Sequence, residues 1–151
     1  FNSFPPINLT NKWRTNMWID HQLKDRRVIL STLWIFVTLN YLYCDVLGLM
    51  DSEILKQFLT GTVDGLVIDK NFLFVGAILM EIPIAMVLLS RILKFKINKW
   101  MNVCAALIKT AAMVLSLFVG SPAGYYLFFA FIEISTTVFI IWYALTWVET
   151  E

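Results

Sequence analysis

The sequence predicts an all-α protein: a bundle of four transmembrane helices with both termini in the cytoplasm and a short amphipathic helix in the first outer loop. Of its 151 residues, 59% are hydrophobic and only 15% are charged, and its mean hydropathy is +0.72. Soluble domains average about half apolar and about a quarter charged residues, so this composition is typical of a membrane protein. Four stretches also reach the roughly 20 mainly apolar residues that a spanning helix needs.

The four predicted spans divide the chain into two parts. They cover residues 28–50, 72–93, 100–119 and 125–148. Residues 1–27 then form a cytoplasmic or interfacial N-terminal segment, and residues 28–151 form the four-helix transmembrane domain. Aromatic residues near the ends of the spans, such as Trp100 and Trp147, fit the two interfaces of a bilayer.

The distribution of Lys and Arg residues predicts the orientation. Basic residues cluster before the first span and between the second and third spans, whereas the first outer loop has more acidic than basic residues and the third loop has no charge. Because cytoplasmic loops contain the excess of Lys and Arg, we expect both termini in the cytoplasm. The basic residues on that side are Lys12, Arg14, Lys24, Arg26, Arg27, Arg91, Lys94, Lys96 and Lys99.

Two segments outside the spans have mixed or amphipathic patterns. The N-terminal segment combines Trp13 and Trp18 with basic residues, and it could lie along the headgroups as a surface helix or form a mobile tail. In the first loop, Asp51 or Ser52 can cap a short helix that Gly61 would end. Such a helix could cover the mouth of a cavity, although an interfacial connection between spans is the more common role.

Every predicted span has a polar group near the middle of its length. Asn40, Glu81 and Lys109 lie near the centres of the first three spans, and Glu133 lies slightly toward the outer side of the fourth. Helical spacing places further polar residues on the same stripes. The candidate ligand- or ion-binding residues are therefore Asn40, Tyr41, Asp45, Glu81, Lys109, Glu133, Thr136 and Thr137.

The charges at this depth do not balance. Lys109 is the only basic residue there, and Glu81 and Glu133 compete for it. A charge at the bilayer centre costs at least about 2.5–3.5 kcal/mol, so such residues face inward and pair, and they usually mark a functional site. One carboxyl group should therefore be protonated, hydrated or shared. Pro83 also removes the backbone hydrogen bond to Leu79 and can bend the second span beside Glu81.

Residue counts exclude several classes of function. A net charge of +1 gives no basic surface for nucleic acid. Cys44 and Cys104 lack CxxC spacing and lie at different depths, so we expect neither thiol redox chemistry nor a disulfide within one chain. Because His21 is the only histidine, a haem with two histidine ligands is excluded, and a zinc site nearly so. The sequence predicts no cofactor and identifies no catalytic residue.

The strings "NYLYCD", "MEIP" and "IEISTT" resemble those of a family of small bacterial four-helix membrane proteins of unknown function. The resemblance extends from about residue 30 to residue 147. It implies a multi-pass protein of the bacterial inner (cytoplasmic) membrane with the same four-helix plan. It implies no reaction, ligand or catalytic residue.

Three functions fit these patterns. The first is a small transporter or proton-linked channel component that binds or translocates a small ligand, a cation or a proton; it implies a homo-oligomer, because four short helices rarely enclose a full pathway. The second is a structural or accessory subunit, in which buried Glu–Lys pairs and hydroxyl contacts simply fasten the helices. The third, ranked last, is a membrane enzyme in which Glu81 or Glu133 acts as acid or base on an amphipathic substrate. The lipid bilayer is the expected partner in all three.

Overall fold

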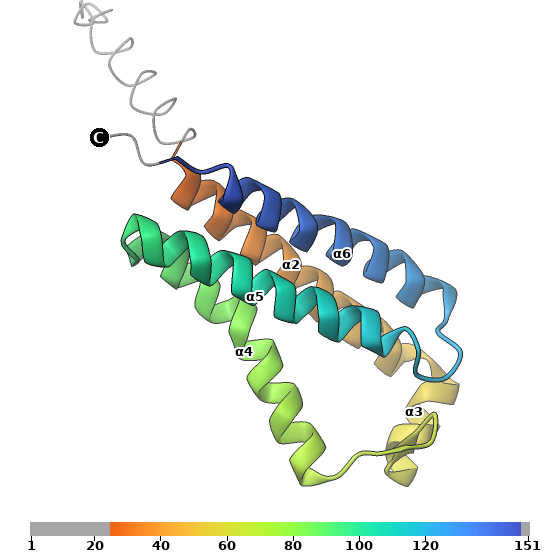
Figure 1. Cartoon of the computed structure of the whole chain (residues 1–151). Coiled ribbons are helices and arrows are strands. Elements are labelled where there is room, and N and C mark those ends of the chain that lie inside the picture. Colours follow the sequence, from red (N-terminus) through yellow and green to blue (C-terminus); the bar gives the residue numbers. More distant parts are fainter. Residues whose placement is uncertain (1–24, 149–151) are drawn as a thin grey trace, which may run out of the picture.

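The computed structural model describes residues 25–148, and the regular elements within this range are α-helices and one short hairpin (Figure 1). The expectation of a surface helix or a tail over residues 1–24 lies outside the described residues. The helices are α2 (Arg26–Met50), α3 (Ser52–Thr60), α4 (Lys70–Ile92), α5 (Phe95–Ser116) and α6 (Gly124–Leu145). The strands β1 (Thr62–Val63) and β2 (Leu66–Val67) pair antiparallel.

Three of the helices are long and apolar enough to cross a membrane: α2, α4 and α6. The helix α5 is as long as α6, but it contains Lys96, Lys99 and Lys109 together with Asn98 and Asn102. By length and composition, the structure thus has three candidate spans where the sequence predicts four.

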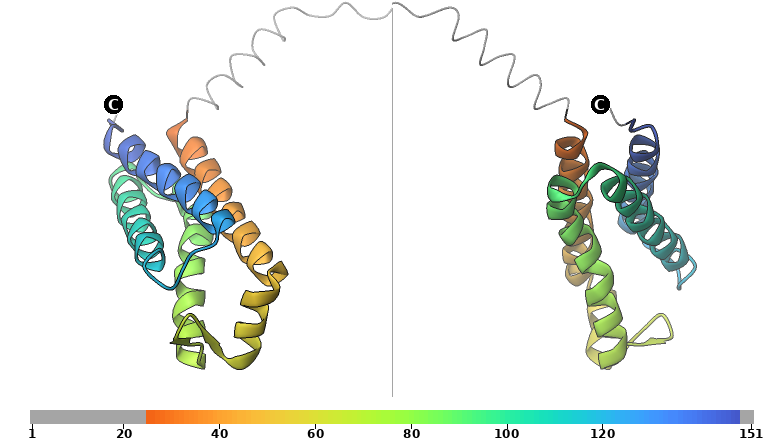
Figure 2. Two further views of the ribbon diagram at one scale, coloured as in Figure 1. Left: turned by 90° about the vertical axis from the view of Figure 1, so that its right-hand side faces the viewer. Right: turned by 60° about the vertical axis from the view of Figure 1, so that its left-hand side comes forward.

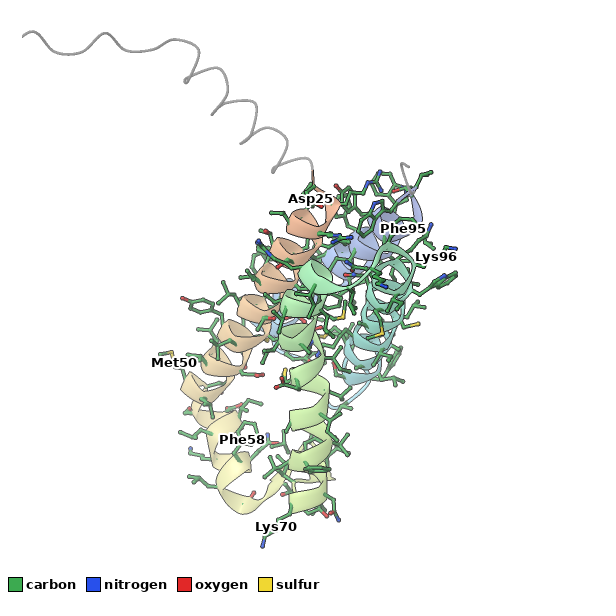
Figure 3. All side chains as sticks on the ribbon, turned by 90° about the vertical axis from the view of Figure 1, so that its left-hand side faces the viewer. Asp25, Met50, Phe58, Lys70, Phe95 and Lys96 are labelled. Carbon is green, nitrogen blue, oxygen red and sulfur yellow. The ribbon has the colours of Figure 1, made fainter. Side chains whose placement is uncertain are left out.

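The four long helices run alternately up and down. The helix α2 packs against both α4 and α6, while α5 packs mainly against α6 and less extensively against α4 (Figures 1 and 2). Figure 3 places Asp25, Phe95 and Lys96 at one end of the molecule and Phe58 and Lys70 at the other. We name these the Arg26 end and the Lys70 end.

The buried core is uneven along the molecule. In α4 the buried side chains are Pro83, Met86 and Ser90, all in its second half, whereas residues 70–79 contain no buried side chain. This first half of α4 diverges from α5 toward the Lys70 end (Figures 2 and 3). The core therefore lies toward the Arg26 end. Its apolar members are Leu30, Trp34, Val37, Tyr41, Met86, Ala105, Ala106, Met113, Ala130 and Ile140.

Two basic residues hold the C-terminal end of α6. Arg26 donates a hydrogen bond from Nη1 to the carbonyl oxygen of Tyr143 at 2.9 Å. Lys99 donates from Nζ to the carbonyl oxygens of Leu145 at 2.8 Å and Trp147 at 3.0 Å. The last carbonyl groups of a helix have no partner within it and form its negative end, so both contacts are favourable.

The short helix expected in the first loop is present. Its N-cap is Asp51, whose carboxylate accepts hydrogen bonds from the backbone N–H groups of Glu53 at 3.0 Å and Ile54 at 3.5 Å. Its C-cap is Gly61, in the left-handed conformation with φ of 77°. The predicted start and stop of this helix are therefore confirmed.

The hairpin after α3 was not expected. Asp64 and Gly65 both have positive φ, 47° and 83°, as a tight two-residue hairpin turn requires, and Asp-Gly is a common sequence for it. The Asp64 side chain lies against Gly120 in the loop between α5 and α6, leaving no room there for a Cβ atom. The two loops at the Lys70 end therefore touch each other.

Candidate functional site

Lys109 is buried where three helices meet. It belongs to α5, and only 4% of its surface is exposed. Its Nζ donates a hydrogen bond of 3.3 Å to the carbonyl oxygen of Leu79 on α4. The same nitrogen lies 3.8 Å from the centroid of the Tyr41 ring on α2, which is close enough for a cation–π interaction. One lysine thus links α5 to both α4 and α2.

The partner of Lys109 on α4 is a carbonyl group that the helix itself leaves unpaired. Residue 83 would normally donate its backbone N–H to the carbonyl of Leu79, but Pro83 has none. A buried carbonyl without a donor costs about 1–3 kcal/mol. Lys109 supplies the missing donor, so the proline and the lysine act together across the α4–α5 contact.

Glu133 is the second buried charged residue of the site. It lies on α6 with 1% of its surface exposed, and neither carboxylate oxygen has a hydrogen-bond partner among the described residues. The charged residues that interact electrostatically with its carboxylate are Lys109 and Asp45. The hydroxyl group of Tyr41, which is 7% exposed, also has no partner there. Because buried polar groups are almost always paired, the Glu133 carboxylate and the Tyr41 hydroxyl group are candidates for contact with a ligand.

Thr137 lies one helical turn after Glu133 on α6. Its hydroxyl group donates to the backbone carbonyl of Glu133 at 2.9 Å and accepts a hydrogen bond of 2.7 Å from the hydroxyl group of Thr110 on α5. This contact fixes the spacing of α5 and α6 next to the acid. The structure therefore brings Tyr41, Lys109, Glu133 and Thr137 together.

The other predicted site residues lie apart from this group or at its edge. Asn40 and Thr136 each donate to a carbonyl of their own helix, those of residues 36 and 132. Asp45 is exposed on α2, although its carboxylate still interacts electrostatically with Lys109 and Glu133. Glu81 is exposed on α4. Lys109 thus faces one buried acid rather than two.

The position of Glu81 follows from the geometry of α4. Successive residues of an α-helix are turned by about 100°, so Glu81 and Pro83 point about 200° apart. Burial of Pro83 against the other helices therefore turns Glu81 outward. By the same geometry Leu79, four residues before Pro83, shares its face and meets Lys109.

A second polar cluster, not predicted from the sequence, lies between α2, α4 and α5 toward the Arg26 end. Trp34 donates from Nε1 to Oδ1 of Asn102 at 2.7 Å, and the hydroxyl group of Ser90 donates to the same oxygen at 3.2 Å. The Nδ2 atom of Asn102 donates to Oδ1 of Asn98 at 2.7 Å, and Nδ2 of Asn98 donates to the Ser90 carbonyl at 2.6 Å. All four side chains are fully buried. The available signal was the spacing of Asn98 and Asn102, which are four residues apart and therefore share one face of the helix.

The comparisons with known proteins identify the family but no function. No curated protein and no solved structure matches the chain. One family model matches, and it extends over all the helices described above. The chain, through residues 17–151, belongs to a family of unknown function, DUF6326.

Proposed function

We propose that this protein is a small multi-pass protein of the bacterial inner (cytoplasmic) membrane whose buried acid–lysine site binds or translocates a small ligand, a cation or a proton. The main support is Glu133, a fully buried carboxylate with no hydrogen-bond donor among the described residues. Near it are a buried ammonium group, Lys109, and the hydroxyl group of Tyr41, which has no hydrogen-bond partner within residues 25–148. Ionisable residues inside spanning helices are expensive and usually functional.

In this proposal α5 is the fourth span. The polar residues that lower its hydropathy, Asn98, Asn102 and Lys109, are all buried within the protein. Its outward side chains between residues 100 and 115 are apolar apart from Cys104, and include Leu107, which is exposed. A helix of this kind can face lipid on one side and protein on the other. The Arg26 end, which has the basic residues, would then be cytoplasmic.

This topology predicts opposite accessibility of two positions. In a background with Cys44→Ala and Cys104→Ala, Ser121→Cys should react with a membrane-impermeant maleimide added outside intact cells. Lys96→Cys should react only after the membrane is permeabilised. Both positions are exposed in the structure, so burial does not confound the comparison. Reaction of both from the same side would contradict four spans with cytoplasmic termini.

A second copy of the chain is the proposed partner for the outward face of α4. Glu81 is exposed near the middle of this span, where a lone carboxylate facing lipid is unfavourable. On a twofold axis it would meet the same residue of a second copy, and two carboxyl groups can share one proton. Glu81→Leu should lower the mass measured by light scattering in mild detergent from dimer to monomer, whereas Ser135→Leu, at an exposed position of α6, should not.

The function itself is tested with the purified protein in liposomes. Under an imposed pH gradient, an internal pH-sensitive dye should report proton movement that Glu133→Gln abolishes. Thr136→Ser is the matched control, because Thr136 lies on the same helix but bonds only to its own backbone. Equal flux in the wild type, Glu133→Gln and empty liposomes would reject translocation, and calorimetry with small cations would then test binding alone.

A structural role is the competing proposal, and one contact favours it. Lys109 already has a partner in the Leu79 carbonyl, and this bond would fasten α4 to α5 without any ligand. A purely structural site predicts that Glu133→Gln changes neither flux nor ligand-induced stabilisation. It also predicts that this variant is at least as stable as the wild type, since a neutral amide is easier to bury than a carboxylate.

A further inference from the structure

The donor set around Glu133 favours the smallest cation. Calcium takes 6–8 oxygen ligands and magnesium needs near-octahedral coordination. Among residues 25–148, no group of three or more His, Cys, Asp or Glu side chains could hold a metal ion. The positive charge of Lys109 acts on the same carboxylate and would oppose a metal cation. A proton needs only one oxygen lone pair and no further ligand.

Lys109 bonds to one acceptor, the Leu79 carbonyl, and interacts electrostatically with a second group that could accept, the Glu133 carboxylate. An ammonium group has three N–H donors. Within residues 25–148 Lys109 uses one of them, in the bond to the Leu79 carbonyl, and at 3.3 Å this bond is slightly longer than usual. Glu133 is the acid whose charge acts most strongly on Lys109. An ammonium group bonds more strongly to an ionised carboxylate than to a neutral carbonyl, because both partners are then charged. Whether Glu133 is charged therefore decides which acceptor is the better one.

We propose that the ligand of this site is a proton, and that Lys109 exchanges between the Leu79 carbonyl on α4 and the Glu133 carboxylate on α6 as the proton binds and leaves. The proposal rests on the function proposed above and narrows its ligand. Hydronium gives its proton to a carboxylate oxygen of Glu133 and leaves as water, while Lys109 stays protonated throughout. With Glu133 neutral, Lys109 bonds to α4, as in the structure; with Glu133 ionised, it turns to α6.

The exchange has a mechanical consequence for α4. When Lys109 leaves, the Leu79 carbonyl loses its donor at the point where Pro83 already interrupts the helix. The half of α4 before this point has no buried side chain, so core packing does not fix the angle at the proline. Proton binding would thus set the position of residues 70–79 relative to α5.

Other titratable groups face the same space and must be separated from Glu133 in the test. On α4, Lys70 and Arg91 lie at the ends of the helix, and Glu81, near its middle, is exposed. The remaining groups are Tyr41, Cys44 and Asp45 on α2, Lys109 on α5 and Tyr126 on α6.

The experiment measures the distance between α4 and α5 as the pH changes. Spin labels are placed at Phe74→Cys and Leu115→Cys, which are 67% and 68% exposed, in the full chain with Cys44→Ala and Cys104→Ala. In nanodiscs, pulsed EPR should show a distance change from about pH 5 to about pH 9. Glu133→Gln should abolish the change and keep the low-pH distance, and Lys109→Met should abolish it as well. Asp45→Asn and Glu81→Gln should retain it.

A second measurement uses the wild type and a conservative variant, so it does not depend on Glu133→Gln or Lys109→Met folding well. Infrared difference spectra of the wild type at low and high pH should contain the stretching band of a protonated carboxyl group, and Glu133→Asp should shift that band. A pH-dependent distance that survives in Glu133→Gln, or a wild type with neither a distance change nor the band, would overturn the proposal. Absence of flux together with an intact pH response would reject translocation while supporting the proton site, so the two failures are distinguishable.

Discussion

At a pH where Glu133 is ionised, replacing Lys109 by Met is expected to lower the free energy of unfolding by about 3–5 kcal/mol, because the buried carboxylate is then left without a compensating charge. Two groups lose their partner at once. The Glu133 carboxylate loses the cation whose charge acts on it, and the Leu79 carbonyl loses its only donor beyond the helix. The measurement is reversible unfolding in mixed micelles, followed by circular dichroism.

A double-mutant cycle with Pro83 separates the two losses. Ala at position 83 has a backbone N–H that can pair with the Leu79 carbonyl, so Lys109→Met should cost less in the Pro83→Ala background. The difference should be about 1–3 kcal/mol, the cost of one unpaired buried carbonyl. Glu133→Gln should recover most of the remainder. Strictly additive effects of Lys109→Met and Pro83→Ala would show that the contact between lysine and carbonyl does not contribute to stability.

Asn102→Leu is the second substitution with a large expected effect. Asn102 accepts from Trp34 and Ser90 and donates to Asn98, all in a fully buried setting. Leu has a similar size but no polar atoms, so the variant leaves several polar groups buried without partners. We expect a loss of about 2–4 kcal/mol in the free energy of unfolding.

Two further variants serve as comparisons for the stability of Asn102→Leu. Met101→Leu, at the neighbouring exposed position, should change stability by less than about 0.5 kcal/mol. Trp34→Phe removes the indole donor and should have a smaller effect than Asn102→Leu, because the Ser90 and Asn98 contacts remain. If Asn102→Leu were neutral in thermal and chemical unfolding, the amide network would not stabilise the bundle.

The elements that could be predicted from the sequence are those set by local rules. Long apolar runs gave the four long helices, and an acidic N-cap followed by a glycine gave α3 with the bounds seen in the structure. The Asp64–Gly65 turn obeys an equally local rule, since Asp-Gly is a common sequence for a tight hairpin turn. The orientation and the number of spans remain predictions, because they depend on lipid and not on contacts within the chain.

The candidate site was harder to predict because it depends on the rotation of each helix. Depth along a span places Glu81, Lys109 and Glu133 at one level, but it does not say which face each residue occupies. The burial of Pro83 decides that question for α4 and turns Glu81 away from Lys109. The missing N–H of Pro83 indicates that the Leu79 carbonyl needs another donor, but only the packing of α5 against α4 shows that Lys109 supplies it.

The second polar cluster could not be predicted from the sequence for a different reason. Asn98, Asn102, Ser90 and Trp34 come from three helices, and each one taken alone is a single polar or aromatic residue in an apolar setting. Only the tertiary arrangement shows that their donors and acceptors match. A sequence pattern can report that a polar residue needs a partner, but not which distant residue supplies it.

The contacts at the end of α6 also determine when folding can finish during synthesis. Arg26 begins the first long helix, yet its partner Tyr143 lies near the end of the last one, and Lys99 likewise pairs with Leu145 and Trp147. Because the ribosome releases the chain from its N-terminus, Arg26 must wait for the synthesis of α4, α5 and α6 before its partner exists, and Lys99 must wait for that of α6. We therefore expect shortened nascent chains that end before residue 143 to remain protease-sensitive at the Arg26 end.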